Sequence, residues 1–299
     1  SSRINLSLTF KKGEVKINNL ATINDQFDKM VTALENDDDQ ALMALTGQDD
    51  GQPKNELSKL AINYETETDS GKSLKKGDWR VWHEGRYLYA PEVKLRVFMR
   101  SFMWSLFDAD EGKPICNSVQ KASLSGDFAD TIGGNRCGRL MKEEAETLAE
   151  DDPRLITSKA VTCNQVIYGV VSGKMKDADG NEVELDNLPI ISYFKKSGFM
   201  PINNFINGLN KQKKIMQRIW IDLKTSKMKK GSVTFFVPVP TEGKSLTSLS
   251  DEDKNLIRMF KDTIDAANAN VIKQHNEALK GNVSDEDSDL SKDFDAITG

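Results

Sequence analysis

Apolar and polar residues alternate through the middle of the chain. Val93, Leu95 and Val97 alternate with Lys94 and Arg96, which is the period-2 pattern of a strand with one solvent-facing side. Runs rich in aromatic and β-branched residues predict further strands at 79–82, 87–89, 161–171, 183–185, 219–223 and 232–239. Turn-forming segments predict hairpin connections at 83–86, 177–181 and 227–231. We therefore expect an antiparallel sheet in this region.

Helical spacing flanks the β-rich region. Residues 4–9 predict a short strand, 23–34 show apolar residues at helical spacing, and the polar stretch 47–56 predicts a loop. A short helix is expected around 202–209, with a basic C-terminal end that suits the helix dipole.

A long helix follows the last predicted strand. Ser250, with Asp253 three residues later, is typical of a helix start, and Gly281 is typical of a helix end. Apolar residues at 3-4 spacing form one stripe along this helix: Ile257, Phe260, Ile264, Ala267 and Val271. Such a stripe either packs on the sheet or pairs with a second subunit, so a homo-oligomer is one of two alternatives.

These elements predict a β-rich α+β fold, with an OB-like antiparallel barrel, helical additions and a long C-terminal helix. The expected organisation is an N-terminal strand and helical arm at 1–56, an OB-like nucleic-acid-binding domain at 57–240, the long helix at 241–283 and a disordered acidic tail at 284–299.

Composition narrows the class of protein. A chain of 299 residues is long enough to bury a core without disulfide staples, and its longest apolar runs are far too short to span a membrane. No charged-then-apolar leader is present, so we expect a cytoplasmic protein, in the host cytoplasm if the chain is viral. The three cysteines are then expected to be reduced thiols.

The net charge of −5 conceals two charged blocks of opposite sign. Residues 285–299 carry six acidic residues and one lysine, whereas residues 192–231 carry ten basic residues and one aspartate. We call residues 192–231 the basic strip. A segment of charge +9 in an acidic protein favours a polyanionic partner.

Two segments resemble ligand-binding motifs without completing them. Gly133–Leu140 has the glycine spacing of a phosphate-binding loop, but Arg139 and Leu140 replace the lysine and hydroxyl residue that the loop requires. A flexible loop is the favoured interpretation, with phosphate contacts through Arg136 and Arg139 as the alternative. Four acidic residues near 180 lack calcium-loop spacing and are interpreted as part of a turn.

The cysteines give no clear metal motif. Cys116, Cys137, Cys163 and His83 are widely separated, whereas structural zinc usually draws its ligands as close pairs. Buried thiols are favoured, and the metal question is left open at this point. No nucleophile motif accompanies either histidine, so we expect no enzyme and no cofactor.

Nucleic-acid binding is the function that the basic residues favour, because they are interleaved with aromatic residues. Cations neutralise phosphates, while aromatic faces stack on unpaired bases. The alternative is that the aromatic residues fill the core and the lysines cover a solvated surface. The candidate binding residues are Trp82, Arg86, Tyr87, Tyr89, Lys94, Arg96, Arg100, Lys195, Lys196, Phe199, Lys211, Lys213, Lys214, Arg218, Trp220, Lys224, Lys227, Lys229 and Lys230.

The acidic tail carries one aromatic residue among its acids. It is interpreted either as a solubilising end or as a peptide that docks partners and competes with DNA for the basic residues. The candidate tail residues are Asp285, Glu286, Asp287, Asp289, Asp293, Phe294 and Asp295.

This layout resembles the single-stranded DNA-binding proteins of bacteriophages. The resemblance is carried by 168–171, the Gly180 hairpin, the basic stretch 211–218, the 229–231 hairpin and the tail. It implies an OB-type barrel that coats single-stranded DNA during replication or recombination, with replication or recombination proteins recruited through the tail and no membrane association. The alternatives are an oligomerising protein of phage assembly and a nucleic-acid enzyme such as a nuclease.

Overall fold

Alternating side chains build a nine-stranded sheet in the part of the chain that the structure describes. The computed structural model describes residues 57–108 and 113–295, with side chains described up to Lys280. The strands are β1 (Ser58–Ile62), β2 (Trp79–His83), β3 (Arg86–Ala90), β4 (Glu92–Asp108), β5 (Lys113–Asn117), β6 (Thr162–Lys176), β7 (Glu182–Lys195), β8 (Ile219–Lys230) and β9 (Val233–Ser245). The helices are α3 (Lys142–Ala145), α4 (Pro153–Ala160), α5 (Phe199–Lys211) and α6 (Asp251–Asp295), and the short 3-10 turns are η1 (Arg136–Gly138), η2 (Lys196–Gly198) and η3 (Met216–Arg218). The predicted strand-rich α+β class and the long C-terminal helix are confirmed.

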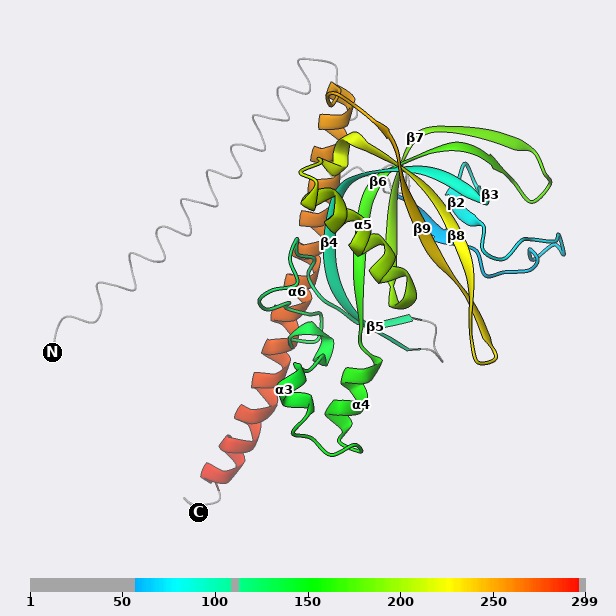
Figure 1. Ribbon diagram of the computed structural model, residues 1–299. Coiled ribbons are helices and arrows are strands. Elements are labelled where there is room, and N and C mark those ends of the chain that lie inside the picture. The colour runs from blue at the N-terminus through cyan, green and yellow to red at the C-terminus, as the bar shows by residue number, and fades with distance from the viewer. Residues whose placement is uncertain (1–56, 109–112, 296–299) are drawn as a thin grey trace. The chain divides into compact units, whose positions relative to one another are not determined.

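The sheet is strongly curled but does not close into a regular barrel (Figure 1). Its strand order is β3-β2-β1-β7-β6-β4-β8-β9, with β5 paired to β4. All pairs are antiparallel except β1 with β7, and a single pairing of Tyr89 with Lys176 ties β3 to β6. Strand β9 pairs only with β8 among the described strands, and it carries Pro238 and Pro240, which cannot donate a ladder hydrogen bond.

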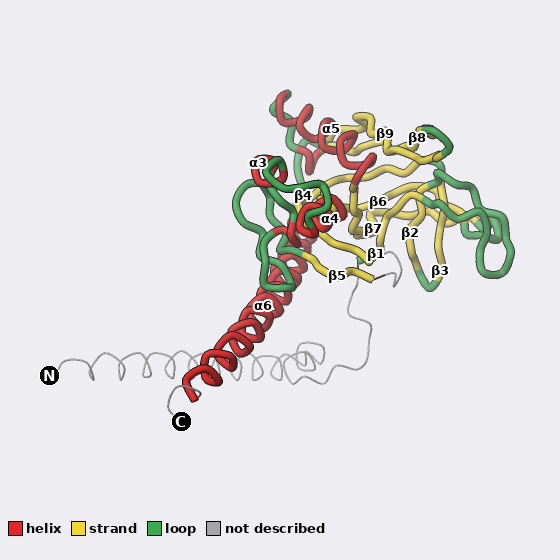
Figure 2. The backbone as a smooth tube through the Cα atoms, turned by 90° about the horizontal axis from the view of Figure 1, so that it is seen from below, coloured by secondary structure: helices red, strands yellow, loops and turns green. Residues whose placement is uncertain are grey.

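Helices α5 and α6 cover opposite faces of the sheet. Ile202 and Ile206 of α5 join the larger core cluster, which includes Ile167 of β6. Phe260 of α6 is 0% exposed and packs with Val166 and Tyr168, the neighbours of Ile167 that point to the other face. Farther along, α6 extends away from the sheet (Figure 2). The predicted apolar stripe of α6 therefore packs on the sheet.

A bulge in β4 shifts the alternation of side chains between the two faces of the sheet, so that Phe98 and Met99 both contact the α6-side core. Val97 pairs with Gly169 and Met99 pairs with Tyr168, so Phe98 is an additional residue on β4. Val97 lies in the α5-side core and Phe98 in the α6-side core. Gly169 leaves no room for a side chain, since a Cβ there would collide with the carbonyl oxygen of Arg96.

An ion pair fixes the start of α6 to the sheet. Arg96 of β4 donates to both carboxylate oxygens of Asp253, with 2.9 Å between its Nη1 and Oδ2, and the two residues are 4% and 5% exposed. Asp253 also accepts from the Ser250 amide at 3.0 Å, while its own amide donates to the Ser250 hydroxyl at 3.1 Å. The predicted N-terminal cap is thus confirmed, and the same carboxylate serves both the cap and the ion pair.

Two boundaries differ from the sequence prediction. Helix α6 continues through Gly281 to Asp295. A single glycine inside a long helix destabilises it by only about 1 kcal/mol relative to alanine, so it need not end the helix. Lys227, Lys229 and Lys230 belong to β8 itself, and the tight turn begins at Gly231. The N-terminal arm at 1–56 and the side chains of the predicted tail, including Phe294, lie outside the described residues.

Replacing Asp253 should remove a contribution to stability from this ion pair that depends on pH. Burial alone would raise the pKa of Asp253, but the hydrogen bonds from Arg96 and Ser250 outweigh burial and hold the pKa below its ordinary value. We expect Asp253→Asn to lower the free energy of unfolding by about 3–5 kcal/mol at pH 7, because Arg96 stays buried without its partner. Because the folded-state pKa is the lower one, this stabilisation is present above the unfolded-state pKa of about 3.9 and is lost as pH falls below it.

Denaturant unfolding of both proteins between pH 7 and pH 3 measures this difference. Asp262→Asn is the matched control, since Asp262 is an exposed acid on the same helix. If the parent and Asp253→Asn differ in unfolding free energy by the same amount at pH 7 and at pH 3, the stabilising role of the Arg96–Asp253 ion pair is contradicted.

Candidate nucleic-acid interface

A cavity of about 530 Å³ opens beside the end of β7, between β4, β5 and β9. Its basic residues are Lys59, Lys195 and Lys196. A second cavity of about 690 Å³ adjoins it and adds Lys75, Lys76 and Lys227. Both cavities are lined by Tyr64 and Phe236, so they adjoin at these two residues, and we call the two cavities together the basic groove.

Tyr64 and Phe236 meet at the centre of the basic groove. Their ring centroids are 6.0 Å apart with an interplanar angle of 69°. The Tyr64 hydroxyl donates to the Phe236 carbonyl at 3.3 Å and accepts from the Phe236 amide at 3.4 Å. These contacts occupy the edge of β9 and join two segments that are 172 residues apart in sequence.

Three aromatic side chains of the groove are partly exposed to solvent. Phe107 is 55% exposed, Tyr64 is 50% exposed and Tyr193 is 38% exposed. The Lys59 ammonium lies 5.6 Å from the centre of the Tyr193 ring. Large aromatic side chains seldom remain this exposed in a group unless they bind something.

The groove concentrates positive charge. Burial lowers the pKa of Lys195, and the neighbouring charges of Lys196 and Lys59 lower it further. This repulsion among three ammonium groups is relieved when an anion binds between them. Three neighbouring ammonium groups give this part of the groove a positive potential.

An aromatic platform lies on β2 and β3, next to β1. Trp82 and Tyr87 are 46% and 41% exposed, and their ring centroids are 4.9 Å apart. The Arg80 guanidinium lies 5.1 Å from the centre of the Tyr87 ring. Because Ala61 of β1 pairs with Arg80, strand β1 connects this platform to the basic groove.

The structure gathers some of the predicted binding residues and separates others. Lys195, Lys196 and Lys227 line the basic groove. Three predicted residues of the β2–β3 hairpin share the face of the aromatic platform, namely Trp82, Tyr87 and Tyr89, whereas Arg86 points to the other face. The Arg86 guanidinium donates to the Asp177 carboxylate at 3.1 Å. The same carboxylate accepts from the backbone amides of Asp179 and Asn181, which confirms that the acidic segment near 180 is a turn.

Several predicted lysines lie outside the groove. Lys214 pairs with Glu242 at 2.6 Å, and Lys224 pairs with Glu92 at 3.2 Å. The remaining ones are exposed but line neither of the two cavities: Lys94, Lys211, Lys213, Lys229 and Lys230.

The prediction that Arg96 faces nucleic acid is wrong, because α6 covers it and Asp253 neutralises it. Trp220 is half-buried, with the Arg96 guanidinium 5.1 Å from its ring, and it packs with the α6-side core. Phe199 packs on Phe102 with 6.0 Å between ring centroids.

Two further predicted arginines are partly removed from solvent. Arg100 stacks on Phe102 at 5.2 Å, and burial lowers its pKa. Arg218 is half-buried, and its Nε has no hydrogen-bond partner within the described residues. Neither residue lines the basic groove.

Among the groove residues that sequence reasoning missed are Lys59, Tyr64, Lys75, Lys76 and Phe107. They lie outside the basic strip, and only strand pairing brings them to it. The Lys75-Lys76 doublet before a glycine and an aromatic strand was the one local signal available.

The glycine-rich loop at 133–140 is built around Asp130. The buried Asp130 carboxylate accepts from the Gly134 and Cys137 amides, each at 2.7 Å. Arg136 donates to the Gly126 carbonyl, and Arg139 donates to the Ser158 carbonyl. Both arginines are thus hydrogen-bonded within the chain, and Asp130 organises the backbone of the loop.

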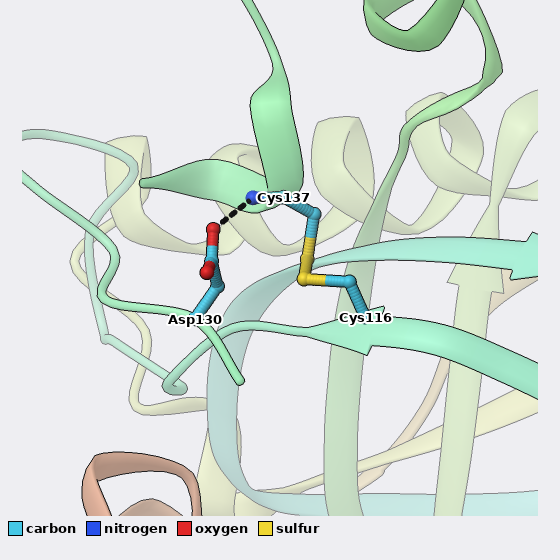
Figure 3. A group of neighbouring side chains, drawn as sticks. All are labelled: Cys116, Asp130 and Cys137. Atoms are coloured by element: carbon cyan, nitrogen blue, oxygen red, sulfur yellow. Dashed lines mark hydrogen bonds between the residues drawn. A yellow bond between two sulfur atoms is a disulfide. The ribbon is translucent and has the colours of Figure 1, made fainter. Parts of the chain in front are cut away.

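Cys116 and Cys137 form a disulfide between β5 and this loop (Figure 3). The expectation of reduced thiols is therefore wrong for these two residues, although both are buried as predicted. The sequence could not show the pairing, because only the folded loop brings Cys137 next to Cys116 of β5, 21 residues away in sequence. Cys163 is a free thiol, and burial raises its pKa to about 11.

Within the described residues, one group has the spacing of metal ligands, namely Cys116, Asp130 and Cys137. It does not fit a metal in this state, because the sulfur atoms are joined and the Asp130 carboxylate is occupied by backbone amides. His83 lies 3.7 Å from Glu84 on the β2–β3 hairpin, and neither His83 nor Cys163 belongs to this group.

Comparison with known proteins gives no family assignment. No family model matches the chain, and no similar curated protein or solved structure was found. In the described part of the chain, no helix combines the length and apolar character needed to cross a membrane.

The disulfide should contribute measurably to stability. Its removal in Cys116→Ser/Cys137→Ser frees a loop of 21 residues in the unfolded chain, so we expect a loss of about 3 kcal/mol in unfolding free energy. Guanidinium titration without reductant measures the loss, and Cys163→Ser is the single-thiol control. Equal stability of the parent with and without excess dithiol reductant would contradict a stabilising disulfide.

Proposed function

We propose that this protein binds single-stranded nucleic acid in the basic groove, without catalysing a reaction. The observation that carries the proposal is the arrangement of Lys59, Lys195 and Lys196 beside the exposed rings of Tyr64, Phe107 and Tyr193. Ammonium groups would neutralise successive phosphates, and the rings would stack on unpaired bases.

The exposed aromatic rings favour single strands over duplex. Bases in a duplex are already stacked and paired, so exposed rings gain little from them, whereas every unpaired base offers a free face. The aromatic platform extends the same combination of rings and cations toward β3 through Lys59 and Arg80. An OB-like character of the curled sheet is part of this proposal, since OB folds bind oligonucleotides on such a surface.

The proposed role follows the resemblance to phage single-stranded DNA-binding proteins. The protein would coat and protect single-stranded DNA during replication or recombination, and the acidic tail would recruit partner proteins. The proposed compartment is the cytoplasm. Reductants there would reach the disulfide slowly, because Cys116 and Cys137 are 1% and 0% exposed.

Salt dependence tests the electrostatic part of the proposal. We expect log affinity for an unstructured oligodeoxynucleotide to fall linearly with log salt, with a slope of about −0.7 per phosphate neutralised. Lys195→Ala/Lys196→Ala should weaken binding and make the slope shallower by about one unit or more. Fluorescence anisotropy over a salt series measures both quantities.

Lys211→Ala/Lys213→Ala is the matched control, because it removes the same charge from the basic strip outside the groove. Lys211 ends α5, about 18 Å along the helix from its start beside Gly198 of the groove. If this control flattens the slope as much as the groove variant does, overall charge rather than the groove governs binding, and the proposal fails.

Stacking is tested separately at Tyr193. Tyr193→Leu keeps an apolar side chain but removes the ring, so we expect a loss of about 1–3 kcal/mol in binding free energy with an unchanged salt slope. Phe235→Leu, on the β8–β9 hairpin and outside both cavities, is the control. Unchanged affinity of Tyr193→Leu, with the native melting temperature, would show that no base stacks on this residue.

A further inference from the structure

A row of polar side chains lines the cavity of about 530 Å³. Asn117 of β5 pairs with Ser105 of β4, and Ser105 pairs with Thr162 of β6. Two residues after Thr162, Asn164 points to the same face, and its Nδ2 donates to the Ser105 hydroxyl at 2.8 Å. Three strands thus place Asn117, Ser105 and Asn164 side by side.

The row keeps unused hydrogen-bonding capacity. Asn164 is 4% exposed, and both of its hydrogen bonds are donated by Nδ2, so within the described residues its Oδ1 has no donor. Ser105 accepts from Asn164 and therefore keeps its hydroxyl hydrogen for another acceptor. Asn117 donates its backbone N–H to the Thr131 hydroxyl. Within the described residues, its side-chain amide has no hydrogen-bond partner.

The surroundings of this row suit one base. Phe107 and Tyr193 offer exposed rings in the same cavity, and Lys195, which pairs with Asn164 across the strands, supplies a cation. A backbone-tracking groove would need only cations and rings. Partly buried amides and a hydroxyl with free donors and acceptors are the groups that read the hydrogen-bonding edge of an unstacked base.

We propose that Asn117, Ser105 and Asn164 form a pocket that receives a single unstacked base and reads its edge. The protein would then prefer certain bases at one position of the bound strand. This inference rests on the proposed function, but it goes beyond binding that depends only on the backbone and on stacking.

Competition among homopolymers tests the pocket, because every register then presents the same base. We expect oligo(dT), oligo(dC) and oligo(dA) of equal length to differ by about fivefold or more in affinity for the parent protein. Asn117→Ala and Ser105→Ala should each reduce that ratio at least about twofold and leave the salt slope unchanged, since no charge is removed. Asn276→Ala, an exposed amide on α6, is the control and should keep the parent ratio.

The outcomes separate the two proposals. If the parent binds all three homopolymers with equal affinity and a steep salt slope, the base pocket is wrong and the proposed function stands. If the ratio persists in both pocket variants while they melt like the parent, the preference arises elsewhere and the pocket is wrong. If no oligonucleotide binds at low salt, the proposed function fails and this inference fails with it.

Discussion

The pairing of β4 with three other strands is the constraint on which the rest of the structure depends. Strand β4 pairs with β6 along most of its length, with β8 at its start and with β5 at its end. Side chains of β4 alternate between the two faces, so one strand packs against both α5 and α6, and the bulge at Phe98 shifts this alternation by one residue. Gly169 is required opposite this bulge because the two backbones approach too closely for a Cβ. The same strand then supplies Ser105 and Phe107 to the cavity.

Local patterns in the sequence were sufficient where neighbouring residues decide the structure. The alternation around Val93–Val97, the turn at Glu84-Gly85 and the cap at Ser250 all depend on residues a few positions apart, and the structure confirms each of them. The same logic failed at Arg96. Its place in the alternation indicated a solvent-facing side, but that side is covered by a helix whose Asp253 is 157 residues away.

The candidate site could be predicted only in part, for the same physical reason. Charge density along the chain pointed to Lys195 and Lys196 but could not find Lys59 or Tyr64, which reach the groove through the parallel pairing of β1 with β7 and through the edge of β9. The disulfide is another case. Cys116 and Cys137 have no informative spacing, and the fold of the loop around Asp130 is what brings their sulfur atoms together.

The edge of β9 also bears on how copies of this protein would behave when crowded. An open strand edge is a template for pairing with another chain, and many copies lined up on one polymer would present such edges to one another at high local concentration. Here Pro238 and Pro240 withhold two backbone donors, and the Tyr64 hydroxyl occupies both the amide and the carbonyl of Phe236. A crowded array of this chain would therefore resist sheet-to-sheet aggregation through β9, and its copies would stay separable when the polymer is released.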